Sequence, residues 1–238
     1  MNNFNYTGDE LQIFERAINW KNYYLSLCKD LFDKNKTVLE IGAGIGGIST
    51  VFQNKVRYKN WTMIEPDEKN YKNLLKRTNK LNKKNKHFYH NLTIEDFLKI
   101  SNKFDLIILA DVLEHLKNDK EILQQIFNIL KPNGSIIIFV PAHQILYSQF
   151  DKKIGHYRRY SKLQLMEIIP KGIKSYKLKY IDSIGFFASL ANKLILKSED
   201  PSLRQIIFWD RFLVKLSRLF DRLLFYKFGK NIFCMISK

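Results

Sequence analysis

An acid followed by closely spaced glycines, Glu40-Ile-Gly-Ala-Gly-Ile-Gly-Gly47, is a candidate ligand-binding loop. Glycines allow a sharp turn and let a ligand approach the backbone beside the positive end of a helix. Gly42, Gly44 and Gly47 fit the dinucleotide pattern G-x-G-x-x-G. Glu40 and the following glycines also fit an acidic pattern, E-x-G-x-G, which ends at Gly46. Because a carboxylate attracts an ammonium group and repels pyrophosphate, the loop favours S-adenosylmethionine over NAD.

A second acid, Glu65, stands at the end of the next predicted strand in Met63-Ile-Glu-Pro-Asp67. A carboxylate at this place can accept hydrogen bonds from both hydroxyls of a ribose, and an NAD enzyme would have an acid there too. Glu65 therefore predicts a nucleoside ligand without identifying it.

Three histidines could take a proton from a substrate. His115, His143 and His156 lie at the carboxyl ends of predicted strands or in the loops that follow, where open α/β sheets bind ligands. Histidine is the usual base near neutral pH for a hydroxyl nucleophile. We favour His156, because packing explains a histidine in a polar loop less well, although a loop-fixing role is open. His115 is the second candidate, and its alternative role is to anchor its own loop.

The loop Gly155-His-Tyr-Arg-Arg-Tyr160 also carries side chains suited to an acceptor molecule. Arg158 or Arg159 could clamp a phosphate or carboxylate; alternatively, one of them pairs with Asp151 and holds the loop. Tyrosine rings near this loop could hold a cationic amine. The candidates for acceptor binding are His143, Tyr147, Tyr157, Arg158, Arg159 and Tyr160.

Alternating strands and helices must position these residues, and their order predicts a mostly parallel α/β sheet. A helix over residues 10–29 is expected before the first strand, with later helices over 119–130 and 161–169. The predicted strands cover 37–41, 61–64, 86–90, 104–109, 135–140, 175–181 and 231–237. We expect an N-terminal helical segment (1–35), a core (36–182), a helical insertion (183–229) and the last strand of the core (230–238).

The insertion has a wide apolar stripe with basic residues beside it. The stripe comprises Ile206, Phe208, Trp209, Phe212, Leu213, Leu216, Leu219, Phe220, Leu223 and Tyr226. The flanking cations are Arg204, Arg211, Lys215, Arg218 and Arg222. We favour a stripe that packs over the sheet as a lid or forms a dimer seam. The alternative is that the stripe lies on an anionic membrane surface and the protein receives a lipid-linked acceptor there.

Composition limits the class of protein. The 238 residues include 40 Lys+Arg and 23 Asp+Glu, a net charge of +17, with 45% hydrophobic residues, which excludes a disordered or collagen-like chain. Such a charge favours anionic neighbours. Cys28 and Cys234 are far apart in the sequence and form neither a disulfide framework nor a metal-binding motif. This is typical of a protein in a reducing compartment. With no secretory signal and no apolar stretch long enough for a span, we expect a cytoplasmic protein, with peripheral contact at the inner face of the membrane as an alternative.

Further motifs follow the glycine loop in order: Leu92-Thr-Ile-Glu-Asp96, the stretch from Phe104 to His115, and Leu130-Lys-Pro-Asn-Gly-Ser135. Over residues 38–140 this series resembles the class I S-adenosylmethionine-dependent methyltransferases. The resemblance implies a seven-stranded, mostly parallel Rossmann-like sheet with helices on both faces and an antiparallel last strand. It implies that the cofactor S-adenosylmethionine, with S-adenosylhomocysteine as product, contacts Glu40, Gly42, Ala43, Gly44, Gly46, Glu65, Pro66, Thr93, Ile94, Ala110 and Asp111.

A narrower resemblance concerns Val140-Pro-Ala-His143, the stretch from Leu146 to Asp151, and the Gly155 to Tyr160 loop. These stretches are similar to a bacterial subgroup of methyltransferases associated with surface-glycan and lipid-linked sugar pathways. The resemblance implies methylation of a hydroxyl on a small molecule, glycan precursor or lipid-linked sugar. The alternatives are an N-methyltransferase of a small amine, an RNA or protein methyltransferase, a noncatalytic cofactor-binding subunit and, from the lone dinucleotide pattern, an NAD-dependent dehydrogenase. We expect no nucleic-acid partner, and a homodimer is an open alternative.

One stretch bears on metal binding. Asp111-x-x-Glu114-His115 is similar to the acidic metal motif of ubiquinone-pathway O-methyltransferases and small-RNA methyltransferases, with His143 as a further candidate ligand. The first position is Asp where those families have Glu, and metal-free relatives carry a similar stretch. We therefore expect no metal, with Mg²⁺ as the alternative.

Overall fold

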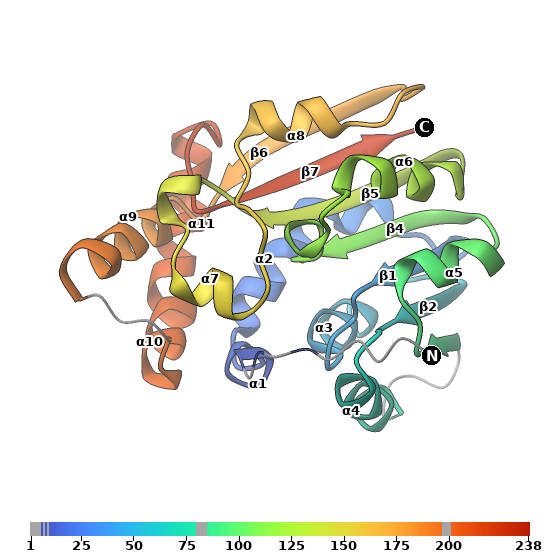
Figure 1. The fold of residues 1–238 in the computed structure, drawn as a ribbon, viewed down its shortest axis with the longest axis horizontal. Helices are drawn as coiled ribbons and strands as arrows, with labels where there is room; N and C mark the ends of the chain where they lie inside the picture. The colour runs from blue at the N-terminus through green and yellow to red at the C-terminus, as the bar shows by residue number, and fades with distance from the viewer. Residues whose placement is uncertain (1–5, 7, 9, 80–84, 197–200) are drawn as a thin grey trace.

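The computed structural model describes residues 6, 8, 10–79, 85–196 and 201–238, and a seven-stranded sheet forms its centre (Figure 1). The strand order is β3-β2-β1-β4-β5-β7-β6, and β7 is antiparallel to both of its neighbours. This confirms the predicted Rossmann-like methyltransferase fold. The strands are β1 (Thr37–Ile41), β2 (Asn60–Ile64), β3 (Lys86–His90), β4 (Phe104–Ala110), β5 (Leu130–Pro141), β6 (Ser175–Ile181) and β7 (Asn231–Ser237).

Alternate residues of the central strands enter two separate hydrophobic cores, one on each face of the sheet. In β1, Leu39 and Ile41 pack in the core beneath α5, α6 and α8, while Val38 faces the core beneath α2, α3 and the insertion. Helices therefore cover both faces. They are α1 (Glu10–Phe14), α2 (Ile18–Cys28), α3 (Gly47–Gln53), α4 (Glu68–Thr78), α5 (Ile94–Ile100), α6 (Asp119–Asn128), α7 (Gln149–Lys153) and α8 (Lys162–Ile168), with short helical turns η1 (Lys29–Leu31), η2 (Leu113–His115) and η3 (Gln144–Leu146).

The helix predicted over 10–29 is two helices, because the chain breaks between α1 and α2. Lys21 reaches back across the break, and its Nζ donates to the carbonyls of Phe14 at 3.0 Å and Glu15 at 2.7 Å. These carbonyls gain a partner that the continuous helix would otherwise supply. The break turns α1 across the carboxyl edge of the sheet (Figure 1). The helix predicted over 119–130 also ends early, since Leu130 already pairs with Phe104 in the sheet.

The insertion between β6 and β7 is helical, as predicted, but its burial differs from the predicted apolar stripe. It contains α9 (Ser183–Ala191), the wide turn η4 (Asn192–Leu196), then α10 (Leu203–Phe208), the wide turn η5 (Trp209–Leu213) and α11 (Val214–Leu223) as one continuous helix. Ile206 and Trp209 are buried, but Leu216, Phe220 and Leu223 are exposed. In the described part of the chain, every helix is too short or too polar to cross a bilayer.

Candidate active site

A cavity of about 1000 Å³ opens at the carboxyl edge of the sheet, where the strand order reverses between β1 and β4. This is the point at which open α/β sheets bind ligands. The loops after β1, β2, β3 and β4 contribute walls, and α1 closes one side. The predicted site residues within its lining are Gly42, Ala43, Gly44, Glu65, Pro66, Thr93, Ile94, Ala110, Asp111, His115, His156, Tyr157 and Arg159.

The glycine loop is held in a conformation that favours glycine. Gly42, Gly44 and Gly46 have φ values of 66°, 54° and 82°. A Cβ atom on Gly42 would lie 2.7 Å from a methyl group of Val112, so either the loop or the Val112 side chain would have to shift. Gly46 caps α3 and lies outside the cavity lining, against Leu74. Gly42 and Gly44 therefore offer backbone to a ligand, whereas Gly46 shapes the turn.

Glu40 does not line the cavity, because β1 directs its side chain into the core that contains α3. Its Oε2 accepts hydrogen bonds from Ser49 Oγ at 2.7 Å and Trp61 Nε1 at 2.9 Å. Burial raises the pKa of Glu40 to about 7, although these two bonds oppose the shift. The carboxylate therefore ties β1 to α3 beneath the glycine loop. Glu40 is thus outside the cavity lining, and its predicted contact with the cofactor stays a prediction.

Glu65 does face the cavity and holds the glycine loop in place. Its Oε2 accepts from the Gly44 amide at 2.8 Å, and its Oε1 accepts from the Asp67 amide at 3.1 Å. Burial raises the pKa of Glu65 to about 7, against these backbone bonds. Thr93, which caps α5, lines the neighbouring wall. A carboxylate here can accept further hydrogen bonds from a bound ligand.

Asp111 ends β4 in a strained conformation, with φ of 55° for a residue that is not glycine. Its amide donates to the Phe139 carbonyl at 2.9 Å, and Asp111 is an exposed residue that lines the cavity. The surrounding protein raises the pKa of Asp111 to about 6, while nearby His156, Lys230 and Arg159 oppose the shift. The fold thus holds a carboxylate of adjustable charge in the cavity.

His156 belongs to a chain of three interacting side chains beside the cavity. Asp151 Oδ1 lies 2.8 Å from His156 Nδ1, and the same carboxylate accepts from Arg159 Nε at 2.9 Å and Nη2 at 3.0 Å. Burial raises the pKa of Asp151, but His156 and Arg159 outweigh it and hold that pKa well below its usual range. Asp151 therefore stays ionised and fixes the imidazole, leaving Nε2 of His156 on the opposite edge of the ring. This pairing of Arg159 with Asp151 is the alternative considered from sequence.

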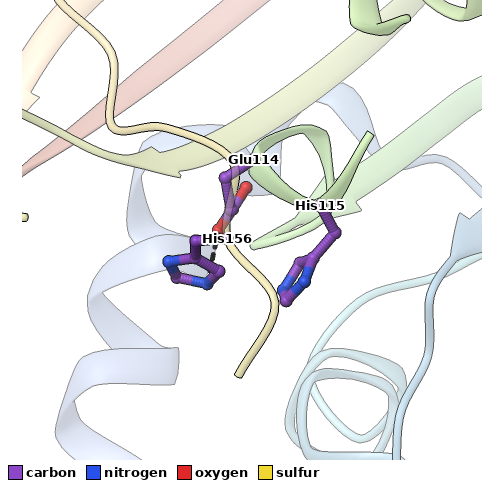
Figure 2. A group of neighbouring side chains, drawn as sticks. All are labelled: Glu114, His115 and His156. Carbon is purple, nitrogen blue, oxygen red and sulfur yellow. Dashed lines mark ion pairs between the residues drawn. The ribbon is translucent and has the colours of Figure 1, made fainter. Parts of the chain in front are cut away.

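Figure 2 shows His156 turned toward Glu114, with His115 beside them. His156 Nε2 lies 3.8 Å from Glu114 Oε1, and the two imidazole centres are 4.6 Å apart. Burial, together with His156, lowers the pKa of His115 to about 3, so His115 is neutral at physiological pH. One ligand atom from each of these three residues lies within 4.8 Å of the others, a spacing that could hold a metal ion. Asp111 and His143 are outside this group, and the expectation of no metal stays a prediction.

Four of the residues predicted to bind an acceptor lie outside the cavity lining. His143 stacks on Tyr180, with ring centres 4.9 Å apart. Tyr147 donates its hydroxyl to the His156 carbonyl at 2.6 Å. Arg158 and Tyr160 both bind Asp119, at 2.5 Å and 2.6 Å. These side chains organise the loops around His156, and the rings of Tyr147, Tyr157 and Tyr160 do not come together as a cage.

Several cavity residues carried no sequence signal. Tyr6, Glu10, Leu11 and Phe14 line it from the N-terminal segment, and Leu11 lies against Gly44. Tyr24, Trp209 and Lys230 line it from α2, the insertion and the start of β7. The hydroxyl of Tyr24 and Nη1 of Arg159 are buried without a hydrogen-bond partner among the described residues. Only the amphipathic pattern of the first helix could have indicated that it packs near the glycine loop.

Comparison with known proteins agrees with this architecture. A family model described as a methyltransferase domain matches residues 12–173. Over 55 residues, 21% of the chain, the sequence is 42% identical to the ubiquinone biosynthesis O-methyltransferase of Glaesserella parasuis serovar 5 (strain SH0165). Over 144 residues, 56% of the chain, it is 28% identical to the mitochondrial counterpart of Dictyostelium discoideum. The matched stretches span 23% and 42% of those two proteins.

Among solved structures, the fold is similar to phosphoethanolamine N-methyltransferase 2 of Haemonchus contortus in complex with S-adenosyl-L-methionine. The TM-score is 0.63 at 18% identity, covering 96% of this chain and 57% of that one. A SAM-dependent methyltransferase from Archaeoglobus fulgidus gives a TM-score of 0.61 at 14% identity, covering 97% and 100% of the two chains. At these identities the likeness establishes a shared fold.

Proposed function

The chain belongs to the methyltransferase-domain family, and on that premise we propose that it transfers a methyl group from S-adenosylmethionine to a hydroxyl group of a small molecule, glycan precursor or lipid-linked sugar. The observation that carries the choice of a hydroxyl is the Arg159–Asp151–His156 chain beside the cavity. A hydroxyl needs a base as it attacks, whereas a neutral amine does not.

The cavity residues fit the proposed cofactor. Gly42 and Gly44 line the cavity without a side chain, and Glu65 presents an acceptor beside them. A carboxylate accepts hydrogen bonds from ribose hydroxyls, and Asp111 offers a negative charge near a cationic sulfonium. When bound, S-adenosylmethionine supplies an activated methyl group, so positioning of the acceptor can provide most of the rate gain.

His156 is the proposed base, and its two ring nitrogens have different tasks. Nδ1 donates to the ionised Asp151, which fixes the tautomer and leaves Nε2 to take the acceptor's proton. Arg159 keeps Asp151 ionised and in place through two hydrogen bonds. His115 is a poorer base, since burial lowers its pKa to about 3. Its edge contact with His156 positions the His156 ring instead.

A polar acceptor suits the remaining groups. Tyr24 Oη and Arg159 Nη1 are buried at the cavity without partners among the described residues, so an acceptor with hydrogen-bonding groups would satisfy them. The tyrosines suggested for a cationic amine are engaged elsewhere or apart, which favours the hydroxyl acceptor over the amine.

The test combines cofactor binding with transfer from radiolabelled S-adenosylmethionine to pools of hydroxylated sugars, lipid-linked sugars and amines. We expect S-adenosylmethionine and S-adenosylhomocysteine, but not NAD, to raise the melting temperature, and Glu65→Ala to reduce that shift. His156→Ala should lower kcat for a hydroxyl acceptor on the order of 100-fold or more without changing S-adenosylhomocysteine affinity.

The matched control is His87→Gln. His87 lies on β3, hydrogen-bonds Tyr58 and is outside the cavity lining. It should leave kcat unchanged. Stabilisation by NAD alone would refute the methyltransferase site. Transfer to amines that His156→Ala leaves intact would refute the hydroxyl acceptor and favour N-methylation.

A further inference from the structure

The continuous helix formed by α10, η5 and α11 buries polar groups alongside Ile206, Trp209 and Val214, yet it exposes a second set of large apolar side chains. Asp210, Ser217 and Asp221 face the protein and are fully bonded there. Asp210 accepts from the Trp20 amide at 2.8 Å, and Asp221 from the Asp182 amide at 2.7 Å. Polar contacts therefore add to the packing of Ile206, Trp209 and Val214 in fixing this helix to the core. The large apolar side chains on its outward face are left for another surface.

These outward side chains recur at three- and four-residue steps, so they share one face of the helix. We name this set the docking face, and its members are between 41% and 62% exposed: Phe208, Phe212, Leu216, Leu219, Phe220 and Leu223. Phe208 and Phe212 contact each other, with ring centres 5.4 Å apart. Exposed apolar groups in such a contiguous row mark an interaction surface.

Cations accompany the docking face, and no acid among the described residues of the insertion is exposed beside it. Arg204, Arg211, Lys215 and Arg222 are exposed along the same helix. The acids of the insertion that the structure describes, Asp210 and Asp221, are both buried and hydrogen-bonded. The accessible charge that the structure describes beside the apolar row is therefore positive.

From these observations we propose that the docking face rests on an anionic phospholipid surface. Apolar side chains in the acyl boundary with flanking Lys and Arg at the headgroups are the chemistry of an interfacial helix. A second copy of this chain would bring two cationic rims together, which opposes dimerisation through this face. Nucleic acid would leave the phenylalanine and leucine side chains unburied, since its backbone contacts require cations alone.

The docking face lies on a helix that also contributes to the cavity. The inference of membrane binding does not depend on the proposed methyl transfer. In Figure 1 α10 and α11 lie together on one side of the molecule, away from α4 and α5. Trp209, on the same helix, lines the cavity. In addition, Lys193 Nζ donates to the carbonyls of Ile145 and Tyr147, in the loop whose Tyr147 bonds His156. A bilayer at this face would lie beside the acceptor side of the cavity.

The experiment is co-sedimentation of the full chain with vesicles of phosphatidylcholine alone or mixed with phosphatidylglycerol. We expect binding to the anionic vesicles only, weakened by salt. Arg211→Glu combined with Lys215→Glu should weaken that binding at least about 20-fold, since each cation lost contributes several-fold. Phe212→Ser combined with Leu216→Ser should also reduce it, because apolar insertion is lost.

The matched control variants change residues away from the docking face. Arg57→Glu with Lys59→Glu makes the same charge change, and Phe88→Ser with Ile100→Ser removes exposed apolar side chains from β3 and α5. Both should bind vesicles like the wild type. The proposal fails if the wild type stays in the supernatant, or if docking-face and control variants bind equally. It also fails if the docking-face variants turn a dimer into a monomer without vesicle binding, or if RNA binding alone responds to the charge change.

Discussion

At the scale of single residues, two buried glutamates show how one side-chain type serves two tasks. Glu40 faces α3 and bonds Ser49 and Trp61, whereas Glu65 faces the cavity and bonds the Gly44 amide. Burial raises the pKa of each to about 7. Since a carboxyl with a raised pKa is held in its protonated form by folding, its ionisation opposes the folded state as pH rises.

Glu40 gives a prediction for stability against pH. An unfolded glutamate has a pKa of about 4.3, so its contribution is fully present below that pH and is lost as pH rises toward 7. The wild type should lose about 3 kcal/mol of unfolding free energy between pH 4.5 and 8 relative to Glu40→Gln. The amide of that variant retains an oxygen that can accept from Ser49 and Trp61. Urea unfolding at several pH values measures the difference.

Glu68→Gln is the control, because Glu68 is exposed and pairs only with Lys72 in the next turn. Its pH profile should follow that of the wild type. Parallel profiles for Glu40→Gln and the wild type would contradict a buried carboxyl at β1 whose ionisation opposes folding.

At the scale of elements, the insertion is attached to the core by carboxylates that bind the start of α9 and a tyrosine of α2. Asp221 accepts from Tyr23 Oη at 2.6 Å, the Asp182 amide at 2.7 Å and the Ser183 amide at 2.9 Å. Three donors converge on one buried carboxylate. These hydrogen bonds require that both carboxylate oxygens act as acceptors. This contact replaces the continuous apolar stripe expected from sequence.

Asp221→Asn should therefore loosen the insertion. An amide nitrogen in place of one oxygen would face a donor, which leaves a buried group unsatisfied and costs about 1–3 kcal/mol. We expect a lower free energy of unfolding and faster cleavage of the insertion in limited proteolysis. Asp30→Asn, at an exposed position, should change neither. An unchanged cleavage pattern in Asp221→Asn would show that apolar packing alone attaches the insertion.

At the scale of the whole molecule, the N-terminal segment connects the loops after β2 and β4 with α4. The Tyr6 amide donates to Asp67 at 2.9 Å, and the Tyr6 ring meets the edge of His115 at 6.0 Å between centres. Glu15 pairs with Arg77 of α4. The segment thus bridges two loops of the cavity.

Ligand binding should consequently stabilise this segment. We expect saturating S-adenosylhomocysteine to slow amide hydrogen exchange in α1 and the glycine loop, because opening of the cavity then requires loss of the ligand. Strands β6 and β7 serve as the internal reference and should change little. Glu65→Ala should remove the protection. Unchanged exchange of α1 with ligand bound would show that the segment closes independently of the site.

The order of strands and helices could be predicted from the sequence, because buried apolar runs and glycine turns are local signals. The strands over 37–41, 86–90, 175–181 and 231–237 agree with the structure to the residue. The sequence also located the loops of the cavity, since parallel strands bring their carboxyl ends to one edge.

Tertiary structure alone decided which side chains of those loops face the cavity. Glu40 lies in β1 and Glu65 directly follows β2. The alternation of side chains in β1 turns Glu40 into a core, while Glu65 meets Gly44. His156 acquires a fixed ring only because Asp151 and Arg159 fold against it. The outward phenylalanines of the insertion have the same origin, since buried partners for Asp210 and Asp221 lie in distant elements. Spacing along the chain records periodicity, but the direction of each side chain depends on partners that only the folded chain brings together.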